Sequence, residues 1–267
     1  MSSTTGFTQK TVWITGASSG IGEALTYAFA ERGARLIISA RRVEELERVK
    51  AQCKIPGLVQ IIPMDLSKVD ELEAKVLLAL AHNGHIDILV NNGGISQRSE
   101  AKDTSLEVYR DIMEVNFFGT IHLSNLVMKH FLERNAGQFV IMSSITGIVG
   151  LPLRTAYTAS KHAIEGFYKS LRTEIWKTNL KVLMVRPASI KTNIAKNALT
   201  GDGGKFNKAD QVIDKGISPE SLAHSIIKAI GQNKSELLAG PAAQQFVIRM
   251  NRFFPGFVFN MLKKIKP

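Results

Sequence analysis

The chain has 267 residues, of which 45% are hydrophobic and 21% are charged. This composition, without a long biased stretch, is typical of a globular protein and excludes a disordered or fibrous one. The single cysteine, Cys53, excludes an internal disulfide and a cysteine metal cluster, and fits a buried helix thiol in a reducing compartment. The net charge of +11 indicates an anionic partner without choosing among nucleic acid, lipid headgroups and a phosphorylated cofactor.

Residues 1–10 show no apolar core of signal-peptide length, so we expect no export. No run of about eighteen or more apolar residues occurs, so we also expect no membrane-spanning helix. These observations predict a cytoplasmic protein that is soluble or bound to the periphery of a membrane.

Short β-branched or apolar runs alternate with longer helical patterns along the chain. This alternation predicts the α/β class, with a doubly wound (Rossmann) parallel sheet and helices on both of its faces. We expect a single domain over 1–267, with its core at about 10–240. Seven strands are predicted, at 11–15, 35–39, 59–64, 88–91, 139–143, 181–186 and 236–239. Helices are predicted at 20–32, 43–53, 69–82, 106–132, 156–176 and 219–231.

The first predicted strand leads into a glycine-rich turn, TGASSGIG at 15–22, and then into a helical pattern. Glycines let backbone amides approach a pyrophosphate, and the N-terminus of the next helix offers unpaired N–H groups. The glycines alone would also fit ordinary turn chemistry. In this context the spacing resembles the TGxxxGxG signature of the short-chain dehydrogenase/reductase family, and the resemblance covers about residues 10–240. It implies a dinucleotide that contacts Gly16, Ser18, Ser19, Gly20, Ile21 and Gly22.

The end of the second predicted strand indicates which dinucleotide is bound. An acid at this place holds a ribose 2′-hydroxyl, whereas a 2′-phosphate requires arginine. Residues 39–42 read Ser-Ala-Arg-Arg, and no acid occurs before Glu44. We therefore predict NADP(H), with Arg41 the better candidate of the two arginines. A solvated arginine pair is the alternative.

Two further turns resemble dinucleotide contacts of the same family. Asp65 and Leu66 follow the third predicted strand, where the family has an adenine-contacting acid, and a helix cap is the alternative for Asp65. The sequence NNGG at 91–94 follows the fourth strand and resembles the family's NNAG, from which it departs by one glycine. The resemblance assigns Asn92 and Gly93 to the cofactor site.

Tyr157 and Lys161 are four residues apart in a predicted helix, so they lie on one face and within one turn. A phenol with a pKa near ~10 is a poor base at neutral pH, and a nearby ammonium favours the phenolate. The pair therefore indicates proton transfer, with Tyr157 as the acid/base and Lys161 as the source of the field. Taken alone, such a pair would be an ordinary helix surface.

Ser144 precedes Tyr157 by thirteen residues and ends the fifth predicted strand, at the edge where open α/β sheets bind ligands. These residues match Ser-x12-Tyr-x3-Lys, the catalytic pattern of the same family, and Asn116 fits its helix asparagine. The resemblance implies that Ser144 polarises the substrate oxygen, that Lys161 also holds the nicotinamide ribose and that Asn116 anchors a proton-relay water. The alternatives are a cap for Ser144 and backbone contacts for Asn116.

The sequence RPASIKT at 186–192 resembles the family's PG-x-[VI]-x-T segment, with Ala188 in place of the glycine. The resemblance implies cofactor contacts from Pro187, Ile190 and Thr192, the last of them to the nicotinamide carboxamide. The six histidines are scattered and the lone cysteine has no partner, so no metal site is predicted.

Substrate specificity is expected in the polar stretch 193–217, which is long enough to form a lid over the active site. The apolar residues that follow the serine predict a hydrophobic ketone, aldehyde or alcohol as substrate, although core packing explains them as well. These residues are Ile145, Ile148, Val149, Leu151 and Leu153.

The C-terminal tail, 241–267, contains no acid, and aromatic residues alternate with bases over 245–266. This pattern predicts either an amphipathic segment on a membrane surface or packing against a partner subunit. The family resemblance also implies pairing through the two long helices, and hence a homodimer or homotetramer. The residues in question are Phe246, Phe253, Phe254, Phe257, Phe259, Arg249, Arg252, Lys263, Lys264 and Lys266.

Two functions of other classes compete with an enzyme. A noncatalytic dinucleotide-binding sensor or scaffold would keep the fold, but all four catalytic residue types are present. A nucleic-acid binder would rest on net charge alone, because no recognition motif occurs, and we predict no nucleic-acid partner. The sequence thus predicts an NADP(H)-dependent oxidoreductase that moves a hydride between nicotinamide and a carbonyl or alcohol carbon.

Overall fold

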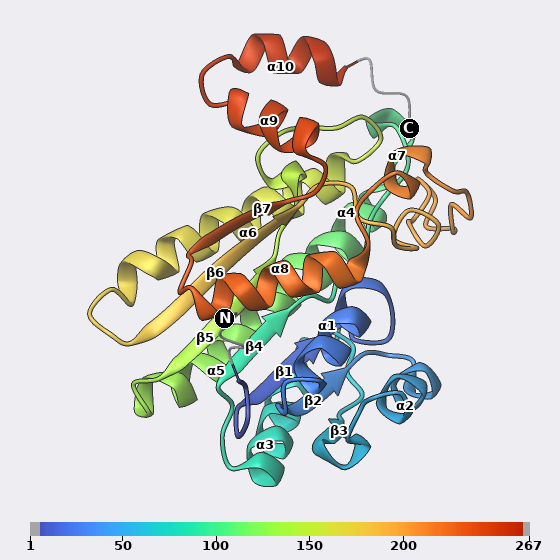
Figure 1. Cartoon of the computed structure of the whole chain (residues 1–267). Helices are drawn as coiled ribbons and strands as arrows, with labels where there is room; N and C mark the ends of the chain where they lie inside the picture. The colour runs from blue at the N-terminus through green and yellow to red at the C-terminus, as the bar shows by residue number, and fades with distance from the viewer. Residues whose placement is uncertain (1–5, 264–267) are drawn as a thin grey trace.

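The structure, a computed structural model that describes residues 6–263, is built on a seven-stranded parallel sheet (Figure 1). The strand order β3-β2-β1-β4-β5-β6-β7 confirms the predicted doubly wound sheet. Residues 1–5 of the N-terminal segment and the tail lysines Lys264 and Lys266 lie outside the described residues. The strands are β1 (Thr11–Thr15), β2 (Arg35–Ser39), β3 (Val59–Ile61), β4 (Ile88–Asn91), β5 (Gly137–Met142), β6 (Leu180–Pro187) and β7 (Glu236–Ala239).

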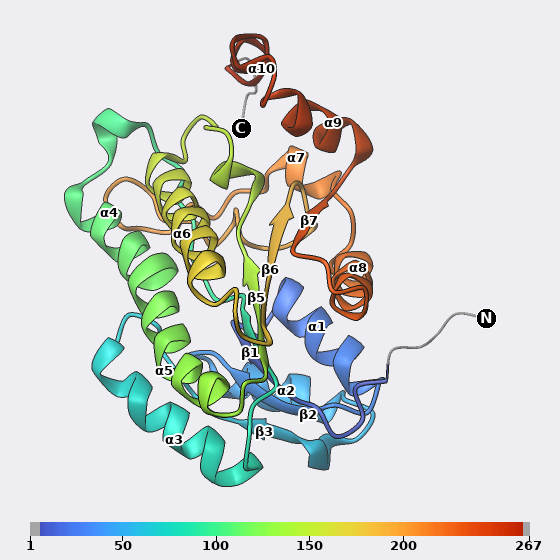
Figure 2. The same ribbon diagram turned by 90° about the vertical axis from the view of Figure 1, so that its left-hand side faces the viewer.

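Helices cover both faces of the sheet, as the edge-on view in Figure 2 shows. Helices α1, α2 and α8 pack on one face, and α3, α5 and α6 on the other. The helices are α1 (Gly20–Ala30), α2 (Val43–Ala51), α3 (Leu72–Asn83), α4 (Leu106–Met113), α5 (Thr120–Glu133), α6 (Thr155–Glu174), α7 (Gln211–Asp214), α8 (Pro219–Gly231), α9 (Ala242–Met250) and α10 (Pro255–Leu262). Shorter turns are η1 (Pro56–Leu58), η2 (Val69–Glu71), η3 (Ala101–Asp103), η4 (Glu114–Gly119) and η5 (Ile145–Gly147).

Most predicted elements differ from the observed ones by a few residues at their ends, and two differences have a clear physical reason. Strand β3 ends at Ile61 instead of residue 64, because Pro63 has no N–H to donate, although Met64 still donates to the carbonyl oxygen of Ala40 at 3.1 Å. The predicted helix 106–132 is divided by the wider π turn η4. Gly119 ends this turn, where a Cβ would fall 1.9 Å from the carbonyl oxygen of Leu66. The helix therefore passes directly over the turn after β3.

The fold positions a site at the carboxyl edge of the sheet. The chain proceeds outward from β1 to β3 in one direction and from β4 to β7 in the other, and ligands of such sheets bind in the crevice at this reversal. The turns after the strands meet there. None of the helices in 6–263 has the length and apolar character needed to cross a membrane.

Candidate active site

A cleft of about 1180 Å³ lies at the carboxyl ends of the strands. Two of the predicted site residues, Gly22 and Asn116, do not line it. The remaining predicted residues do: Gly16, Ser18, Ser19, Gly20, Ile21, Arg41, Asp65, Leu66, Asn92, Gly93, Ser144, Tyr157, Lys161, Pro187, Ile190 and Thr192.

The glycine turn closes on the loop after β4. A Cβ on Gly16, whose φ is +65°, would lie 2.8 Å from the Cα of Gly93, and one on Gly22 would lie 2.3 Å from the carbonyl oxygen of Gly16. Gly22 therefore serves close packing of α1 on the turn. Within residues 6–263, Ser19 makes no side-chain cap to α1, so the first N–H groups of this helix are left for an anion. This backbone fits a dinucleotide pyrophosphate.

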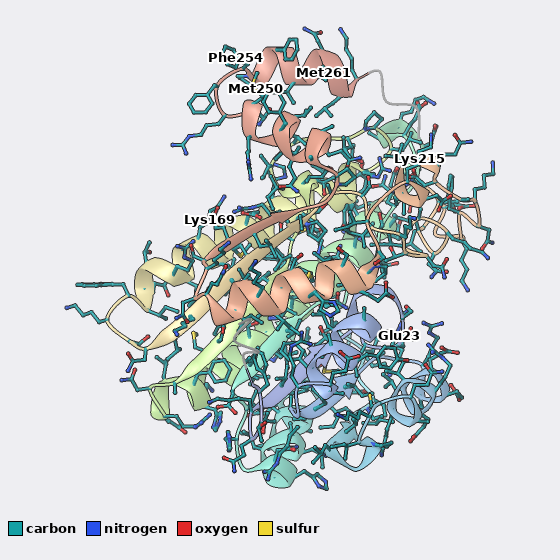
Figure 3. All side chains as sticks on the ribbon, in the orientation of Figure 1. Glu23, Lys169, Lys215, Met250, Phe254 and Met261 are labelled. Carbon is teal, nitrogen blue, oxygen red and sulfur yellow. The ribbon has the colours of Figure 1, made fainter. Side chains whose placement is uncertain are left out.

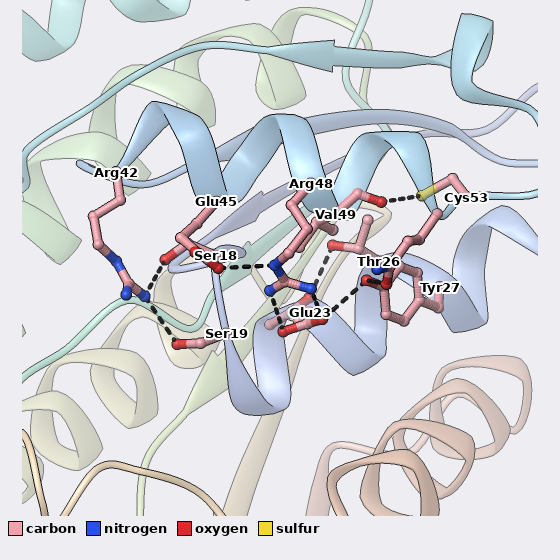
Figure 4. A network of polar contacts seen from close by, with 12 residues as sticks. Ser18, Ser19, Glu23, Thr26, Tyr27, Arg42, Glu45, Arg48, Val49 and Cys53 are labelled. Atoms are coloured by element: carbon pink, nitrogen blue, oxygen red, sulfur yellow. Dashed lines mark hydrogen bonds and ion pairs between the residues drawn. The ribbon is translucent and has the colours of Figure 1, made fainter.

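Arg42 contacts the glycine turn (Figure 4). Its Nη2 donates to the Ser18 Oγ at 3.1 Å and to the Ser19 Oγ at 3.4 Å. The sequence favoured Arg41, which also lines the cleft, but the structure brings the Arg42 guanidinium onto the turn. Sequence spacing could not separate two adjacent arginines, because their directions depend on how α2 begins at Val43.

The acid Glu23 also lines the cleft, but Arg48 neutralises it. The Arg48 Nη1 and Nη2 donate to its two carboxylate oxygens at 2.7 and 3.0 Å, as Figure 4 shows. The hydrogen bond from Arg48 lowers the pKa of Glu23 although burial raises it. The carboxylate of Glu23 is therefore already paired with a cation.

Thr15 fixes the loop after β4. Its hydroxyl oxygen accepts from the backbone N–H groups of Asn92 and Gly93 at 3.0 and 2.9 Å, and the Asn92 side chain donates back to the Thr15 carbonyl oxygen at 2.9 Å. Asp65 lines the cleft while one of its oxygens accepts from the N–H and hydroxyl of Ser67 at 3.0 and 2.9 Å. These hydrogen bonds thus stabilise the turn after β3, and the Asp65 side chain does not cap a helix.

Asn116 lies in the π turn η4 and is buried. Its amide oxygen accepts from the Ile95 N–H at 2.8 Å, and its nitrogen donates to the Ile95 carbonyl oxygen at 2.9 Å and to the Ser160 Oγ at 3.0 Å. Asn116 therefore joins the loop after β4 to α6, the helix of Tyr157. The backbone contact left open by the sequence is present, and a water role for Asn116 stays a prediction.

Ser144, Tyr157 and Lys161 meet in the cleft. Ser144 follows β5, and its hydroxyl oxygen accepts from the Thr146 N–H at 3.1 Å as the cap of η5. The Lys161 Nζ lies 5.6 Å from the centroid of the Tyr157 ring and donates to the Met142 carbonyl oxygen at 2.7 Å. The carbonyl at the end of β5 thus holds the ammonium beside the phenol.

Burial lowers the pKa of Lys161 to about 8, and the charge of Glu165 opposes this effect. Burial raises the pKa of Tyr157, while a hydrogen bond with Ser144 and the charges of Arg154 and Arg98 lower it. Lys161 therefore loses its proton before Tyr157 does. Two arginines, which the sequence did not indicate, thus also act on the phenol.

These arginines belong to a buried ion triad that the sequence did not reveal. The Asp210 Oδ2 accepts from the Arg98 Nη2 and from the Arg154 Nη2, each at 2.9 Å, and all three residues are buried. Asp210 lies in the predicted lid 193–217, and Arg154 precedes α6 by one residue. The triad thus fastens this segment beside Tyr157 and leaves one net positive charge there.

Replacing Asp210 with asparagine is expected to lower the free energy of unfolding by about 3 kcal/mol, because two buried guanidinium groups lose their counter-ion. Urea unfolding measures this loss. Asp202→Asn is the control, since Asp202 is an exposed acid of the same segment. Equal losses in the two variants would contradict a stabilising triad.

Glu165 connects α6 to β6. Its two oxygens accept from the Arg186 Nε and Nη2 at 2.8 and 2.7 Å, and both residues are buried. Burial raises the pKa of Glu165. The hydrogen bond from Arg186 and the interactions with other cations outweigh this effect and lower the pKa overall. Glu165 is one turn beyond Lys161, so this ionised carboxylate supports the ammonium. An i,i+4 count from Lys161 would have found it.

The loop after β6 completes the cleft with Pro187, Ile190 and Thr192. Ile190 is buried and forms a bridge with Ile217, so the two ends of the predicted lid are joined. The Cγ2 of Thr192 lies 3.1 Å from the place of a Cβ on Gly20, so this loop closes on the glycine turn. No group of three or more His, Cys, Asp or Glu residues in 6–263 is arranged to hold a metal ion.

The predicted apolar substrate wall is wrong as a description of the cleft. None of its five residues lines the cleft. Ile145, Ile148 and Val149 instead pack against Ile248 and Val258 of the tail. The alternative of core packing is correct here, because two tail helices that the sequence did not resolve cover these side chains.

The family model for short chain dehydrogenases matches residues 10–202. The chain belongs to this family. It is 41% identical over 261 residues to a "Dehydrogenase/reductase SDR family protein 7-like" of Anopheles gambiae, covering 96% of this chain and 82% of that protein. It is 45% identical over 212 residues to the human "Dehydrogenase/reductase SDR family member 7", covering 76% of this chain and 62% of that protein.

Solved structures share the fold. A short-chain dehydrogenase/reductase from Burkholderia phymatum in complex with NAD superposes with a TM-score of 0.84 at 21% identity, covering 94% of this chain and 95% of that one. An alcohol dehydrogenase from Thermococcus sibiricus complexed with 5-hydroxy-NADP gives 0.76 at 23% identity, covering 87% and 97%. The family membership makes this protein a dehydrogenase/reductase, and these ligands do not choose between NAD and NADP.

Proposed function

We propose that this protein is an NADP(H)-dependent oxidoreductase that interconverts a carbonyl and an alcohol, with Tyr157 as the acid/base. The observation that carries the proposal is that Ser144, Tyr157 and Lys161 line the same cleft as the glycine turn. A dinucleotide held at that turn reaches the phenol through one continuous space.

The preference for NADP(H) is supported by charge. Arg41 and Arg42 line the cleft after β2, and the acid Glu23 is already paired with Arg48. A 2′-phosphate finds guanidinium groups there, whereas a 2′-hydroxyl lacks the acidic acceptor that usually follows the second strand.

Different residues of the chain have different roles at the substrate oxygen. NADPH, when bound, supplies the hydride for the carbonyl carbon. Tyr157 donates its proton to the substrate oxygen, since burial raises the pKa of this phenol and keeps it protonated at neutral pH. The Ser144 hydroxyl donates a hydrogen bond to the same oxygen. The charges of Arg98 and Arg154 favour the phenolate that remains.

Carbonyl reduction is expected to slow as the pH rises above about 8, where Lys161 loses its proton. Its lowered pKa means that the ammonium is charged below this pH and neutral above it. Glu165→Gln removes a charge that raises the pKa of Lys161. In this variant the decline of kcat/KM on the basic side of the pH profile (the basic limb) should therefore begin at a lower pH than in the wild type. The measurement is the pH dependence of kcat/KM, and thermal unfolding across the same range separates activity from stability. An unchanged basic limb in Glu165→Gln would contradict this role of Lys161.

We further propose a substrate with an apolar portion. The support is now Ile95, Ile194 and Leu199, which line the cleft in place of the predicted wall. The test is a panel of small polar and larger apolar carbonyls with NADPH and with NADH. We expect NADPH consumption with the apolar members, and turnover confined to small polar carbonyls would reject the substrate class.

A homodimer or homotetramer remains our proposal for assembly. Leu106 and Phe118 are exposed on the long helical stretch α4-η4-α5, and Trp176 just after α6 is exposed as well. Such apolar side chains are suited to contact with a second copy. Sedimentation velocity of the wild type measures the assembly, and a monomer at working concentration would contradict it.

A further inference from the structure

The tail forms a two-helix projection at one end of the molecule (Figures 1 and 3). Helices α9 and α10 pack on the body through Ile248, Val258 and Leu238. Phe254 lies in the turn between the two helices, with Met250 below it (Figure 3). A small apolar cluster therefore anchors the projection.

The outward side of this projection is aromatic. Five phenylalanines are each more than half exposed: Phe246 (64%), Phe253 (72%), Phe254 (55%), Phe257 (59%) and Phe259 (65%). A phenylalanine presents about 150–250 Å² when it is fully exposed, so together they present on the order of 500 Å². Soluble monomers rarely leave a patch of this size without a partner, whether membrane or protein. We call these five residues the tail surface.

The aromatic residues of α10 form a convex surface. Val258 is the buried residue of this helix, and Phe257 and Phe259 lie about 100° to either side of it. Side chains that splay from a projecting helix do not form a flat or hollow face for a folded partner. They suit a medium that deforms around them, such as the headgroup region of a bilayer.

The charges beside the tail surface identify the kind of bilayer. Arg249 is exposed on α9, Arg252 in the turn between the two helices and Lys263 just after α10, and no acid follows Glu236 in the chain. Within residues 6–263, none of these three bases is in an ion pair. Two copies meeting here would bring like charges together, whereas anionic headgroups would attract them.

We propose that the tail surface binds the surface of an anionic membrane, with the phenylalanines in the interfacial layer and the bases on the headgroups. The tail also packs on Ile145 and Ile148, just after Ser144, so the bound bilayer lies beside the strand end that carries this serine. The proposal does not depend on the catalytic roles given above, because binding is measured without turnover.

Flotation of the full chain with vesicles tests the proposal. We expect the protein to float with vesicles of phosphatidylcholine and phosphatidylserine, and less with phosphatidylcholine alone. The variant Phe253→Ser/Phe257→Ser/Phe259→Ser should lose more than about tenfold of its partitioning, since three buried phenyl groups are removed. Arg249→Gln/Arg252→Gln should reduce the preference for the anionic vesicles.

The control is Leu77→Ser. Leu77 is 63% exposed, close to the 64% of Phe246, and it lies on α3, outside the tail and outside the helices proposed for self-association. This variant should float like the wild type. The triple variant changes exposed side chains only, so its thermal unfolding and NADPH affinity should match those of the wild type.

Two results would overturn the proposal: failure of the wild type to float with either vesicle, or flotation of the triple variant equal to that of the wild type. If the wild type fails to float and sedimentation velocity shows that the triple change abolishes self-association, the tail surface joins copies of the chain instead.

Discussion

Tyr157→Phe is expected to reduce NADPH-dependent carbonyl reduction by at least about 10²–10⁴-fold, because the substrate oxygen loses its proton donor. The phenol lies beside Lys161 and lines the same cleft as Ser144, so removing one oxygen leaves the packing of α6 in place. Binding of NADPH, measured by fluorescence titration, should change little. The variant would thus bind the dinucleotide without turning it over.

Tyr109→Phe is the matched control. The Tyr109 hydroxyl forms an exposed hydrogen bond of 2.8 Å with the Oγ1 of Thr155, the first residue of α6. The variant therefore also removes one phenol oxygen that contacts this helix. We expect nearly full activity from it. Comparable turnover in Tyr157→Phe and the wild type would reject Tyr157 as the acid/base and favour a dinucleotide-binding scaffold.

Arg42→Ala is expected to raise the KM for NADPH by about tenfold to a hundredfold while leaving the KM for NADH nearly unchanged. A charge-assisted bond to a 2′-phosphate contributes on this scale, and NADH has no such phosphate. Arg42 already lies on the glycine turn through Ser18 and Ser19, so we expect a larger effect from it than from Arg41→Ala.

Arg35→Ala provides the control for the loss of one positive charge. Arg35 is exposed at the opposite end of β2, away from the cleft, and its removal should leave both KM values unchanged. The assignment of NADP(H) would be contradicted if the wild type had similar KM values for NADH and NADPH and Arg42→Ala left the ratio of these two values unchanged.

The sheet could be predicted because its signals are local. Strands β1 and β4 are buried along their whole length, and each contains a run of three apolar residues, Val12–Ile14 and Ile88–Val90. The glycine turn could be predicted as well, since Gly22 packs against the carbonyl oxygen of Gly16, a few residues earlier in the chain. Such contacts leave a fixed spacing in the chain.

The parts that were missed depend on distant contacts. Arg98, Arg154 and Asp210 are separated by up to 112 residues, and each looks like an ordinary surface charge in the sequence. The apolar run after Ser144 was assigned to the substrate because its true partners, Ile248 and Val258, lie about a hundred residues later. Periodicity reports which face of an element is apolar, but not what covers that face.

The central claim is that a hydride passes from bound NADPH to a substrate carbon beside Tyr157. NADPH deuterated at the transferring side of nicotinamide C4, supplied with an apolar ketone from the panel, tests it through mass spectrometry of the alcohol product. We expect the deuterium on the carbinol carbon. Hydrogen from solvent at that carbon, or dinucleotide binding without consumption across the whole carbonyl panel, would contradict the account.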